Sequence, residues 1–423
     1  MRISLVFLLG MCVGAALAWG WTLREQAAPE TVSSADMAQS VEQLAAALVE
    51  ATSFVEQHAW YGTEQEQAEA YHHLLSSLMN GLESYGLSDP DFPFFHELNT
   101  RNKVGMDNSD QRYLIARLRG DAAYRVWGNR GTSRRMDITL YEEDDLSASI
   151  ASIMTEQLET DENGDFELFI GGEPRSVNWL PSHIGPGRLL IRQQHSDWET
   201  ESPGRIHIDR IDSARPVYPQ LRPLDVTQRV DAVTDYFASS VRRWPEMGRT
   251  RIAALFPVNT LSGPRDVGGE GGLSGRIMVG GHYKLAADEA LIITTRPTGA
   301  SYQGIQLGSH WWQSLDYANR QTSLTTDQAH LSSDGAYHFI VSEQDPGYSN
   351  WLDTSGLPRG LVLLRFDGLP QPELSEGQIP SARVVPMSEV VRFLPGDEPL
   401  VTPEQRRAVI AGRRQHVQRR FGY

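Results

Sequence analysis

Residues 113–127 read YLIARLRGDAAYRVW. Residues 113–118 and 124–127 are rich in β-branched, aromatic and other apolar residues, as short strands are. Between them, Gly120-Asp121 is a turn signal, because Gly and Asp favour the backbone angles of tight turns. This stretch therefore predicts two strands joined by a turn.

The same pattern recurs along most of the chain. Further candidate strands are residues 136–141, 166–170, 189–192, 205–211, 276–279, 290–295, 302–307, 337–341, 361–366 and 384–387. Many short strands with Gly- and Pro-rich turns predict a mainly β fold, β-sandwich or jelly-roll-like. Strands and helices do not alternate regularly, which disfavours a Rossmann fold or a TIM barrel.

Helical patterns occur at both ends and once in the middle. An N-terminal helical pair is expected, with Thr63-x-x-Glu66 as the capping box of its second helix. Apolar residues at helical spacing from Val226 to Trp244, just before Pro245, predict an internal helix, and Thr402 and Pro403 begin a C-terminal helix. The expected division is 1–23 signal peptide or membrane anchor, 24–34 stalk, 35–100 helical pair, 101–215 first β region, 216–250 connecting helix, 251–395 second β region and 396–423 basic helix.

The N-terminal segment predicts a location outside the cytoplasm for the body of the protein. Arg2 precedes an uncharged, mostly apolar run over residues 3–21. This run is just long enough to span a bilayer, so we expect it to anchor the protein in the inner membrane with the body in the periplasm. Alternatively, Ala16-Leu17-Ala18 is a cleavage site, and cleavage near Ala18 would release a soluble periplasmic protein.

Composition excludes several function classes. The 423 residues carry 54 acidic and 38 basic side chains, a formal net charge of −16, which disfavours nucleic acid as a partner. The single cysteine, Cys12, lies in the apolar run, so the predicted body has neither a disulfide nor a thiol nucleophile.

One segment resembles a known family. The blocks are Thr295-Arg296-Pro297, residues 307–317 (LGSHWWQSLDY), Asn319-Arg320-Gln321, Asp345-Pro346-Gly347 and residues 350–354 (NWLDT). Together they resemble the bacterial family called domain of unknown function 1214, and residues 124–131 resemble an upstream segment that accompanies it. The resemblance covers about residues 100–395. It implies a β-sandwich in an envelope protein and implies no particular activity.

Aromatic and polar residues are concentrated in and near the block from His310 to Arg320. On a strand, His310 and Trp312 would share one face, and an aromatic face beside polar groups suits a sugar or another amphipathic ligand. The predicted ligand-binding residues are Trp198, Trp311, Trp312, Tyr317, Asn319, Arg320, Asn350 and Trp351. The alternative is that both adjacent Trp residues are core and that Asp316 and Arg320 pair to hold a loop.

Catalytic and metal-binding patterns are weaker. No G-x-S-x-G, S-x-x-K or H-E-x-x-H motif occurs, and the catalytic residues stay unknown, with His310, Asp316 and Asp353 as candidates. Two carboxylates can hydrolyse a glycoside without a sequence motif. Asp345, Asn350 and Asp353 are weak calcium candidates against a simple turn, so we expect no cofactor.

These observations favour a periplasm-facing envelope protein that binds a small molecule or glycan in an aromatic, Arg- and Asp-lined cleft. A hydrolase or lyase acting on a carbohydrate or envelope substrate is the first alternative. A structural envelope component is the second.

Overall fold

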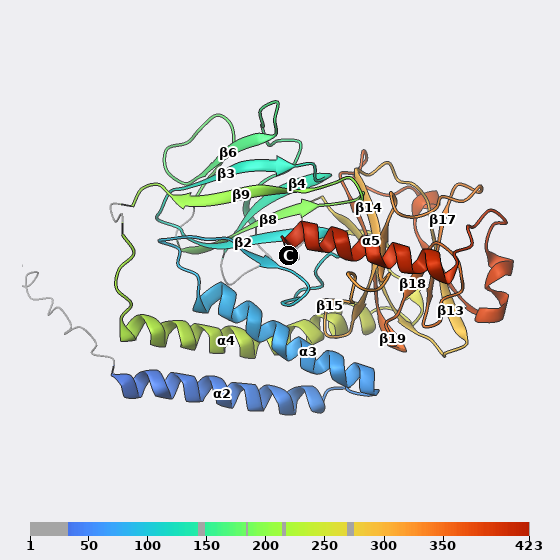
Figure 1. The fold of residues 1–423 in the computed structure, drawn as a ribbon, viewed down its shortest axis with the longest axis horizontal. Coiled ribbons are helices and arrows are strands. Elements are labelled where there is room, and N and C mark those ends of the chain that lie inside the picture. The colour runs from blue at the N-terminus through green and yellow to red at the C-terminus, as the bar shows by residue number, and fades with distance from the viewer. Residues whose placement is uncertain (1–32, 143–148, 183–184, 214–216, 269–274, 423) are drawn as a thin grey trace, which may run out of the picture.

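Two β regions and a helical layer make up the molecule (Figure 1). The computed structural model describes residues 33–142, 149–182, 185–213, 217–268 and 275–422. Its strands form four sheets in which neighbours are mostly antiparallel. This architecture confirms the predicted mainly β class with additional helices.

The first β region is a sandwich of two sheets. One sheet has the order β1 (His96–Leu98), β2 (Gln111–Arg119), β8 (Pro186–Gln194), β4 (Arg135–Glu142) and β5 (Ser149–Ile153). The other has the order β7 (Trp179–Leu180), β6 (Asp165–Ile170), β3 (Tyr124–Gly131) and β9 (Pro203–Arg210). Alternate residues of both sheets, such as Leu114, Val126 and Leu189, fill one core between them.

The second β region has the same two-layer design. Its larger sheet contains β10 (Thr260–Leu261), β12 (Ile277–Lys284), β19 (Arg359–Asp367), β14 (Tyr302–Ser309) and β15 (Gln313–Ser314), with β11 (Arg265–Asp266) and β16 (Ser323–Thr325) at its margins. The smaller sheet runs β18 (Trp351–Asp353), β17 (Tyr337–Ser342), β13 (Glu289–Thr295) and β20 (Ser381–Pro386), followed by a 3₁₀ segment at Met387–Phe393. Val279, Ile293 and Leu364 are among the residues that fill the core between these sheets.

The predicted helical pair is part of a three-helix layer. Helices α2 (Ser34–Glu56) and α3 (Glu64–Gly81) both pack on α4 (Pro223–Gly248), and Trp311 of the second β region lies in their shared core. The Thr63–Glu66 capping box forms as predicted. The predicted internal helix corresponds to α4. Pro245 is buried within α4, which continues to Gly248 and into a π-helical turn at Arg249–Ala253.

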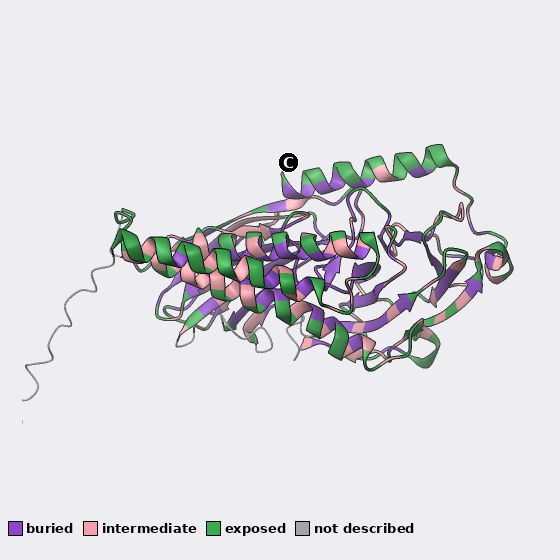
Figure 2. Ribbon diagram, turned by 90° about the horizontal axis from the view of Figure 1, so that it is seen from below, coloured by how far each residue is buried: buried purple, intermediate pink, exposed green. Residues whose placement is uncertain are grey.

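The C-terminal helix α5 (Pro403–Phe421) lies along the β regions with one side exposed (Figures 1 and 2). Thr402 caps it as the sequence predicted. Arg406, Arg413 and Arg420, seven residues apart, are all buried against the protein, whereas Arg407 and Arg414 face solvent. Helical periodicity thus divides the arginines of this basic helix into an inner and an outer set.

The predicted anchor or signal, residues 1–23, and the stalk up to residue 32 lie outside the described residues. Within the described part of the chain, no helix has both the length and the apolar character needed to cross a membrane.

Candidate functional site

A cavity of about 790 Å³ lies where the two β regions meet the helical layer. Its walls come from β2, β4 and β8 of the first region, from β12 and β19 of the second, and from α4. The exposed residues Asp235, Ser239 and Arg243 line it at four-residue intervals along α4. The volume falls in the range of small-molecule sites, which are typically about 300–1,000 Å³.

Strand alternation builds the wall formed by the first β region. In β8, Leu189 and Ile191 point into the sandwich core, so Arg188, Leu190 and Arg192 point to the opposite face and line the cavity. Tyr141 of β4 pairs with Arg188 in register and joins the same face.

The second β region repeats this arrangement. In β19, Leu364 and Phe366 enter the core while Leu363 and Arg365 line the cavity. Met278 of β12 pairs with Arg365 in register and lies on the same side. Each sandwich therefore presents arginines on the outer face of one sheet, and these two faces meet at the cavity.

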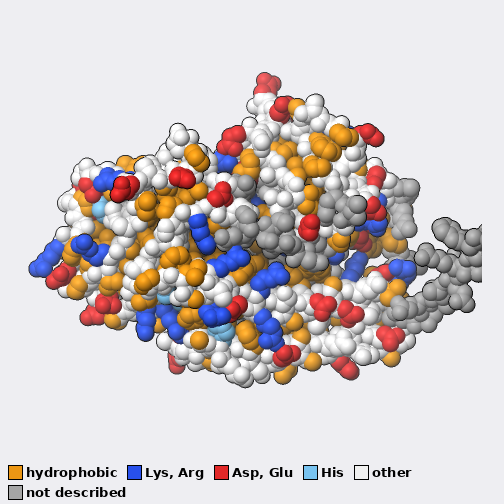
Figure 3. Space-filling model, turned by 180° about the vertical axis from the view of Figure 1, so that it is seen from behind, with side chains coloured by type: hydrophobic (Ala, Val, Ile, Leu, Met, Phe, Trp, Pro, Cys, Tyr) orange, Lys and Arg blue, Asp and Glu red, His pale blue; other side chains and the backbone are white. Residues whose placement is uncertain are grey.

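The cavity is rich in positive charge. Of the described residues that line it, two are acidic, Asp107 and Asp235, and seven are arginines: Arg188, Arg192, Arg243, Arg251, Arg265, Arg276 and Arg365. Seen from behind, basic side chains gather near the middle of the molecule beside apolar ones (Figure 3). This concentration is unexpected in a chain with a formal net charge of −16.

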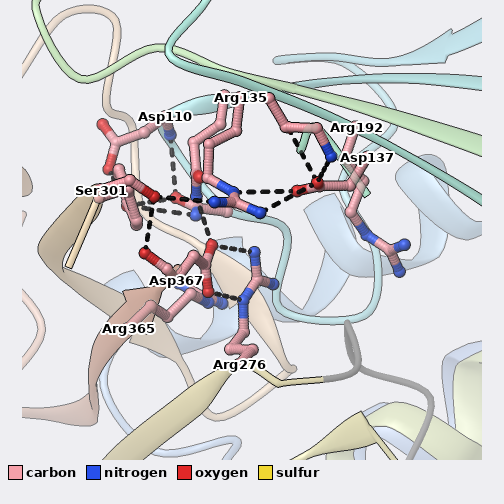
Figure 4. Close-up of polar contacts among 12 residues, drawn as sticks. Asp110, Arg135, Asp137, Arg192, Arg276, Ser301, Arg365 and Asp367 are labelled. Atoms are coloured by element: carbon pink, nitrogen blue, oxygen red, sulfur yellow. Dashed lines mark hydrogen bonds and ion pairs between the residues drawn. The ribbon is translucent and has the colours of Figure 1, made fainter. Parts of the chain in front are cut away.

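Arg276 is neutralised by the protein itself. Its guanidinium makes two hydrogen bonds of 2.7 Å to the buried carboxylate of Asp367, to which Gln194 also donates (Figure 4). Burial lowers the pKa of Arg276, but the charge of Asp367 and its hydrogen bonds together outweigh that effect and raise the pKa above its ordinary value. Gln194 belongs to the first β region and Asp367 to the second, so this cluster also joins the two sandwiches.

Three other guanidinium groups lack such compensation. Among the described residues, no carboxylate lies within 4.0 Å of Arg188, Arg192 or Arg365. Arg192 donates to the hydroxyls of Tyr141 (3.0 Å) and Thr139 (3.4 Å). The nearby carboxylate of Asp137 is already engaged by Arg135 (Figure 4).

Arg365 and Arg188 differ most in the hydrogen bonds that their guanidinium groups make. Arg365 donates to the side-chain oxygen of Gln306 (2.6 Å) and to the carbonyl of Met106 (2.8 Å). The Nε atom of Arg188 is buried with no hydrogen-bond partner among the described residues. Burial lowers the pKa of both arginines, because a guanidinium loses hydration of its charge there. A bound anion would relieve this cost.

Aromatic side chains form much of the remaining wall. They are Tyr85, Tyr113, Tyr141, Tyr236, Trp244 and Trp312. Trp312 has a left-handed backbone (φ 62°), held by hydrogen bonds from its N–H to Ser309 and from Met106 to its carbonyl. A Cβ atom on Gly248 would lie 3.2 Å from the Trp312 ring, so the glycine lets the indole pack closely on α4.

Tyrosine hydroxyls supply neutral donors at the cavity. Tyr113 accepts a hydrogen bond from the backbone N–H of Asn108 (2.9 Å), which leaves its own proton for another acceptor. Burial raises the pKa of Tyr113. At Tyr141 burial acts in the same direction, but the charge of Arg192 and the hydrogen bonds to the hydroxyl together outweigh it and lower the pKa.

The structure does not bring the sequence-predicted ligand-binding residues together in one cleft. Of these residues, Trp312 lines the cavity. Trp311 is 1% exposed and lies in the core of the helical layer. Trp198 and Tyr317 are buried against α5, where the rings of Trp198 and His416 stack at 4.8 Å.

The other predicted binding residues hold loops. Asn350 is buried and bonds both the N–H and the carbonyl of His330. Trp351 donates to Ser342 and is covered by Arg406. Asn319 is exposed and accepts from Arg414.

The predicted catalytic candidates are also separated. His310 is buried and stacked on Trp60 with ring centroids 3.9 Å apart, and burial lowers its pKa to about 3. Asp316 accepts from the backbone of Ala318 and Asn319, which makes it a turn residue. The alternative interpretation, in which Asp316 pairs with Arg320, is wrong on this point, because the side chain of Arg320 pairs with Asp353 at 2.9 Å.

The weak calcium candidates engage different partners. Asp345 pairs with Arg406, Asp353 pairs with Arg320, and Asn350 bonds the loop at His330. In the described ranges, no group of three or more His, Cys, Asp or Glu side chains is placed to hold a metal ion.

The spacing of arginines in apolar strands is a sequence signal for the cavity residues. Arg188 and Arg192 are an even number of positions apart in the apolar strand 188–192 (RLLIR), so alternation places both charges on one face and Leu189 and Ile191 on the other. Such a pattern also fits a solvent-exposed sheet face. Only the three-dimensional arrangement shows that α4 and the second sandwich cover this face.

Comparisons with known proteins show the fold more than the function. No family model and no curated protein matches the chain. A crystal structure of an uncharacterized protein from Burkholderia cenocepacia is similar, with 26% identity, 83% of this chain and 97% of that chain covered, and a TM-score of 0.74. The VPA0106 protein from Vibrio parahaemolyticus, at 14% identity over 74% of this chain and 98% of that one, has a TM-score of 0.43, too low to support an argument.

Proposed function

We propose that this protein binds an amphipathic organic acid in the cavity between its two β regions. One observation carries the proposal: at the cavity, Arg188, Arg192 and Arg365 have no carboxylate partner among the described residues, and they lie beside aromatic and aliphatic walls. Arginine recognises carboxylate and phosphate groups through paired hydrogen bonds, and the aromatic wall suits an apolar body. The protein would act as a binding protein for such a ligand.

The cellular setting is part of the same proposal. The apolar run at residues 3–21 and the cysteine-free body support a protein that faces the periplasm and is anchored in the inner membrane. The blocks between residues 295 and 354 support its placement in the domain of unknown function 1214 family. Protease added to spheroplasts should digest the body, whereas protection from it would contradict a periplasmic location.

The binding proposal can be tested with probes that differ in charge. Calorimetric titration of the full-length protein should show binding of 2-naphthoate, and at least tenfold weaker binding of the uncharged 2-naphthamide. Equal affinities would show that the arginines do not select an acid.

Substitution of a cavity arginine then tests whether the ligand binds in the cavity. Arg188→Gln should weaken 2-naphthoate binding about tenfold or more, since a hydrogen bond to a charged group contributes about 1.5–3 kcal/mol. Among the described residues, the side chain of Arg188 has no carboxylate partner and its buried Nε atom has no hydrogen-bond partner, so its substitution should leave folding intact. Arg205→Gln is the matched control, because Arg205 is exposed on β9 away from the cavity. Unchanged binding by Arg188→Gln would place the ligand elsewhere.

A further inference from the structure

The cavity draws its uncompensated charge from both β regions. Arg188 and Arg192 lie on β8 of the first sandwich, and Arg365 lies on β19 of the second. Arg192 donates to the hydroxyls of Tyr141 and Thr139. Arg365 donates to the side-chain oxygen of Gln306 and to the carbonyl of Met106, so all four acceptors are neutral. A ligand with one negative charge would compensate one of these three cations and leave the others uncompensated.

Tyr113 lies beside arginines of both β regions. It pairs in register with Arg192 across β2 and β8, and both side chains line the cavity. Its hydroxyl accepts from the N–H of Asn108, and the N–H of the next residue, Ser109, donates to the Gln306 oxygen that also accepts from Arg365. Arg276 is neutralised by Asp367, so the charges of Arg192 and Arg365 are left for a ligand there, and the Tyr113 hydroxyl adds a neutral donor beside them. Burial raises the pKa of Tyr113, and the charges of these arginines act against that effect.

We propose that this point takes a dianionic head group of the phosphate-monoester type, held between Arg192 and Arg365 with Tyr113 as a further donor. The inference rests on the proposed function and narrows its ligand class. A phosphate monoester carries a charge of about −1.5 to −2 at pH 7 and three strong acceptor oxygens. Two guanidinium groups and a hydroxyl match that charge and that number of acceptors better than a single carboxylate does.

The test compares two probes with the same apolar body. At pH 7.5, 2-naphthyl phosphate is mostly a dianion, and its methyl diester is a monoanion. Calorimetry on the full-length protein should give a dissociation constant at least tenfold lower for the monoester. Arg365→Gln should remove this preference while changing diester binding less than threefold, because Arg192 still meets a single negative charge.

A second variant keeps the test valid if Arg365→Gln does not fold. Arg192→Gln changes only side-chain hydrogen bonds and should also remove the monoester preference. Arg205→Gln should keep it. Equal affinities in the native protein, or a preference that survives both Arg365→Gln and Arg192→Gln, would overturn the inference and leave the proposed function standing. If neither probe nor 2-naphthoate binds, both proposals fail.

Two further probes separate the sources of such a head group. Inorganic phosphate alone should bind at least tenfold more weakly than 2-naphthyl phosphate, because it cannot contact the aromatic wall; equal binding would overturn the role of the apolar body. Dihexanoyl phosphatidate, a short lipid with the same head group, should bind as tightly as the naphthyl probe or more tightly if the natural source is a lipid. Weaker binding by the lipid would support a soluble monoester.

Discussion

At the scale of single residues, a buried charge is stabilised where the protein itself supplies an oppositely charged side chain. Arg276 and Asp367 are both almost fully buried and form a two-bond pair at the junction of the sandwiches. Removing one member of such a pair leaves an uncompensated buried charge. Within the part of the chain that the structure describes, the neighbouring Arg188, Arg192 and Arg365 lack that compensation, which is why the cavity and not the pair is the candidate site.

The buried pair makes a first prediction. Asp367→Asn should lower the free energy of unfolding by about 3–5 kcal/mol, because it leaves the Arg276 guanidinium buried and unneutralised. Thermal denaturation checks this. Glu50→Gln, which breaks an exposed pair with Arg242, is the control and should leave the melting temperature nearly unchanged. A similar loss in both variants would contradict the role assigned to burial.

A second prediction concerns pH and His310. Burial lowers the pKa of His310 to about 3, so between that value and the ordinary 6.5 the unfolded chain binds a proton that the folded chain does not. Stability contributed by this group is therefore complete above pH 6.5 and is lost as the pH falls toward 3. His310→Phe keeps an aromatic ring against Trp60 and removes the titration.

Denaturant unfolding at pH 7 and pH 4.5 measures the effect. The native protein should lose stability between these pH values, and His310→Phe should lose less, by up to about 1.4 kcal/mol per pH unit. Other buried histidines, His73 and His96, have pKa values lowered to about 4 and should keep part of the slope in the variant. An unchanged slope would show that His310 is protonated in the folded state.

At the scale of elements, helix α5 is attached through arginines and not only through apolar side chains. The buried guanidinium of Arg413 donates to the carbonyls of Tyr317 and Ser323 and to the Ser323 hydroxyl. Arg420 donates to Ser109 and to His416. Arg413→Ala should therefore loosen α5, costing about 1.5–3 kcal/mol for each charged hydrogen bond that is lost without replacement.

Hydrogen exchange along α5 reports this attachment. The amides of the helix should exchange faster in Arg413→Ala, whereas Arg407→Ala, on the exposed side, should leave them protected. If both variants exchange alike, the inward arginines do not fasten the helix.

The elements were largely predictable, and the site was not. Period-two runs located strands such as 290–295 and 302–307, and capping boxes located two helix starts, because these signals are local. The sequence predicted Trp311 and Trp312 as ligand-binding residues, but their burial depends on α4 and α2, which are distant in sequence. Arg188 and Arg365 are 177 positions apart, so no local pattern could place them at one cavity.

At the scale of the whole molecule, polar contacts unite the two sandwiches. Tyr302 donates to Asp110 (2.6 Å), Gln194 donates to Asp367 (2.7 Å), and Arg135 donates to Ser301 (2.8 Å), each across the junction. We expect both β regions to unfold in one calorimetric transition, since neither can separate without exposing these buried groups unpaired. Two resolved transitions would contradict this coupling.

The alternation of side chains in β8 has an evolutionary consequence. Leu189 and Ile191 maintain the sandwich, whereas Arg188, Leu190 and Arg192 determine what the cavity can accept. Substitutions at the second set can alter selectivity without disturbing the residues that specify the fold. Descendants of this scaffold can therefore acquire new chemical preferences by drift along one face of a single strand.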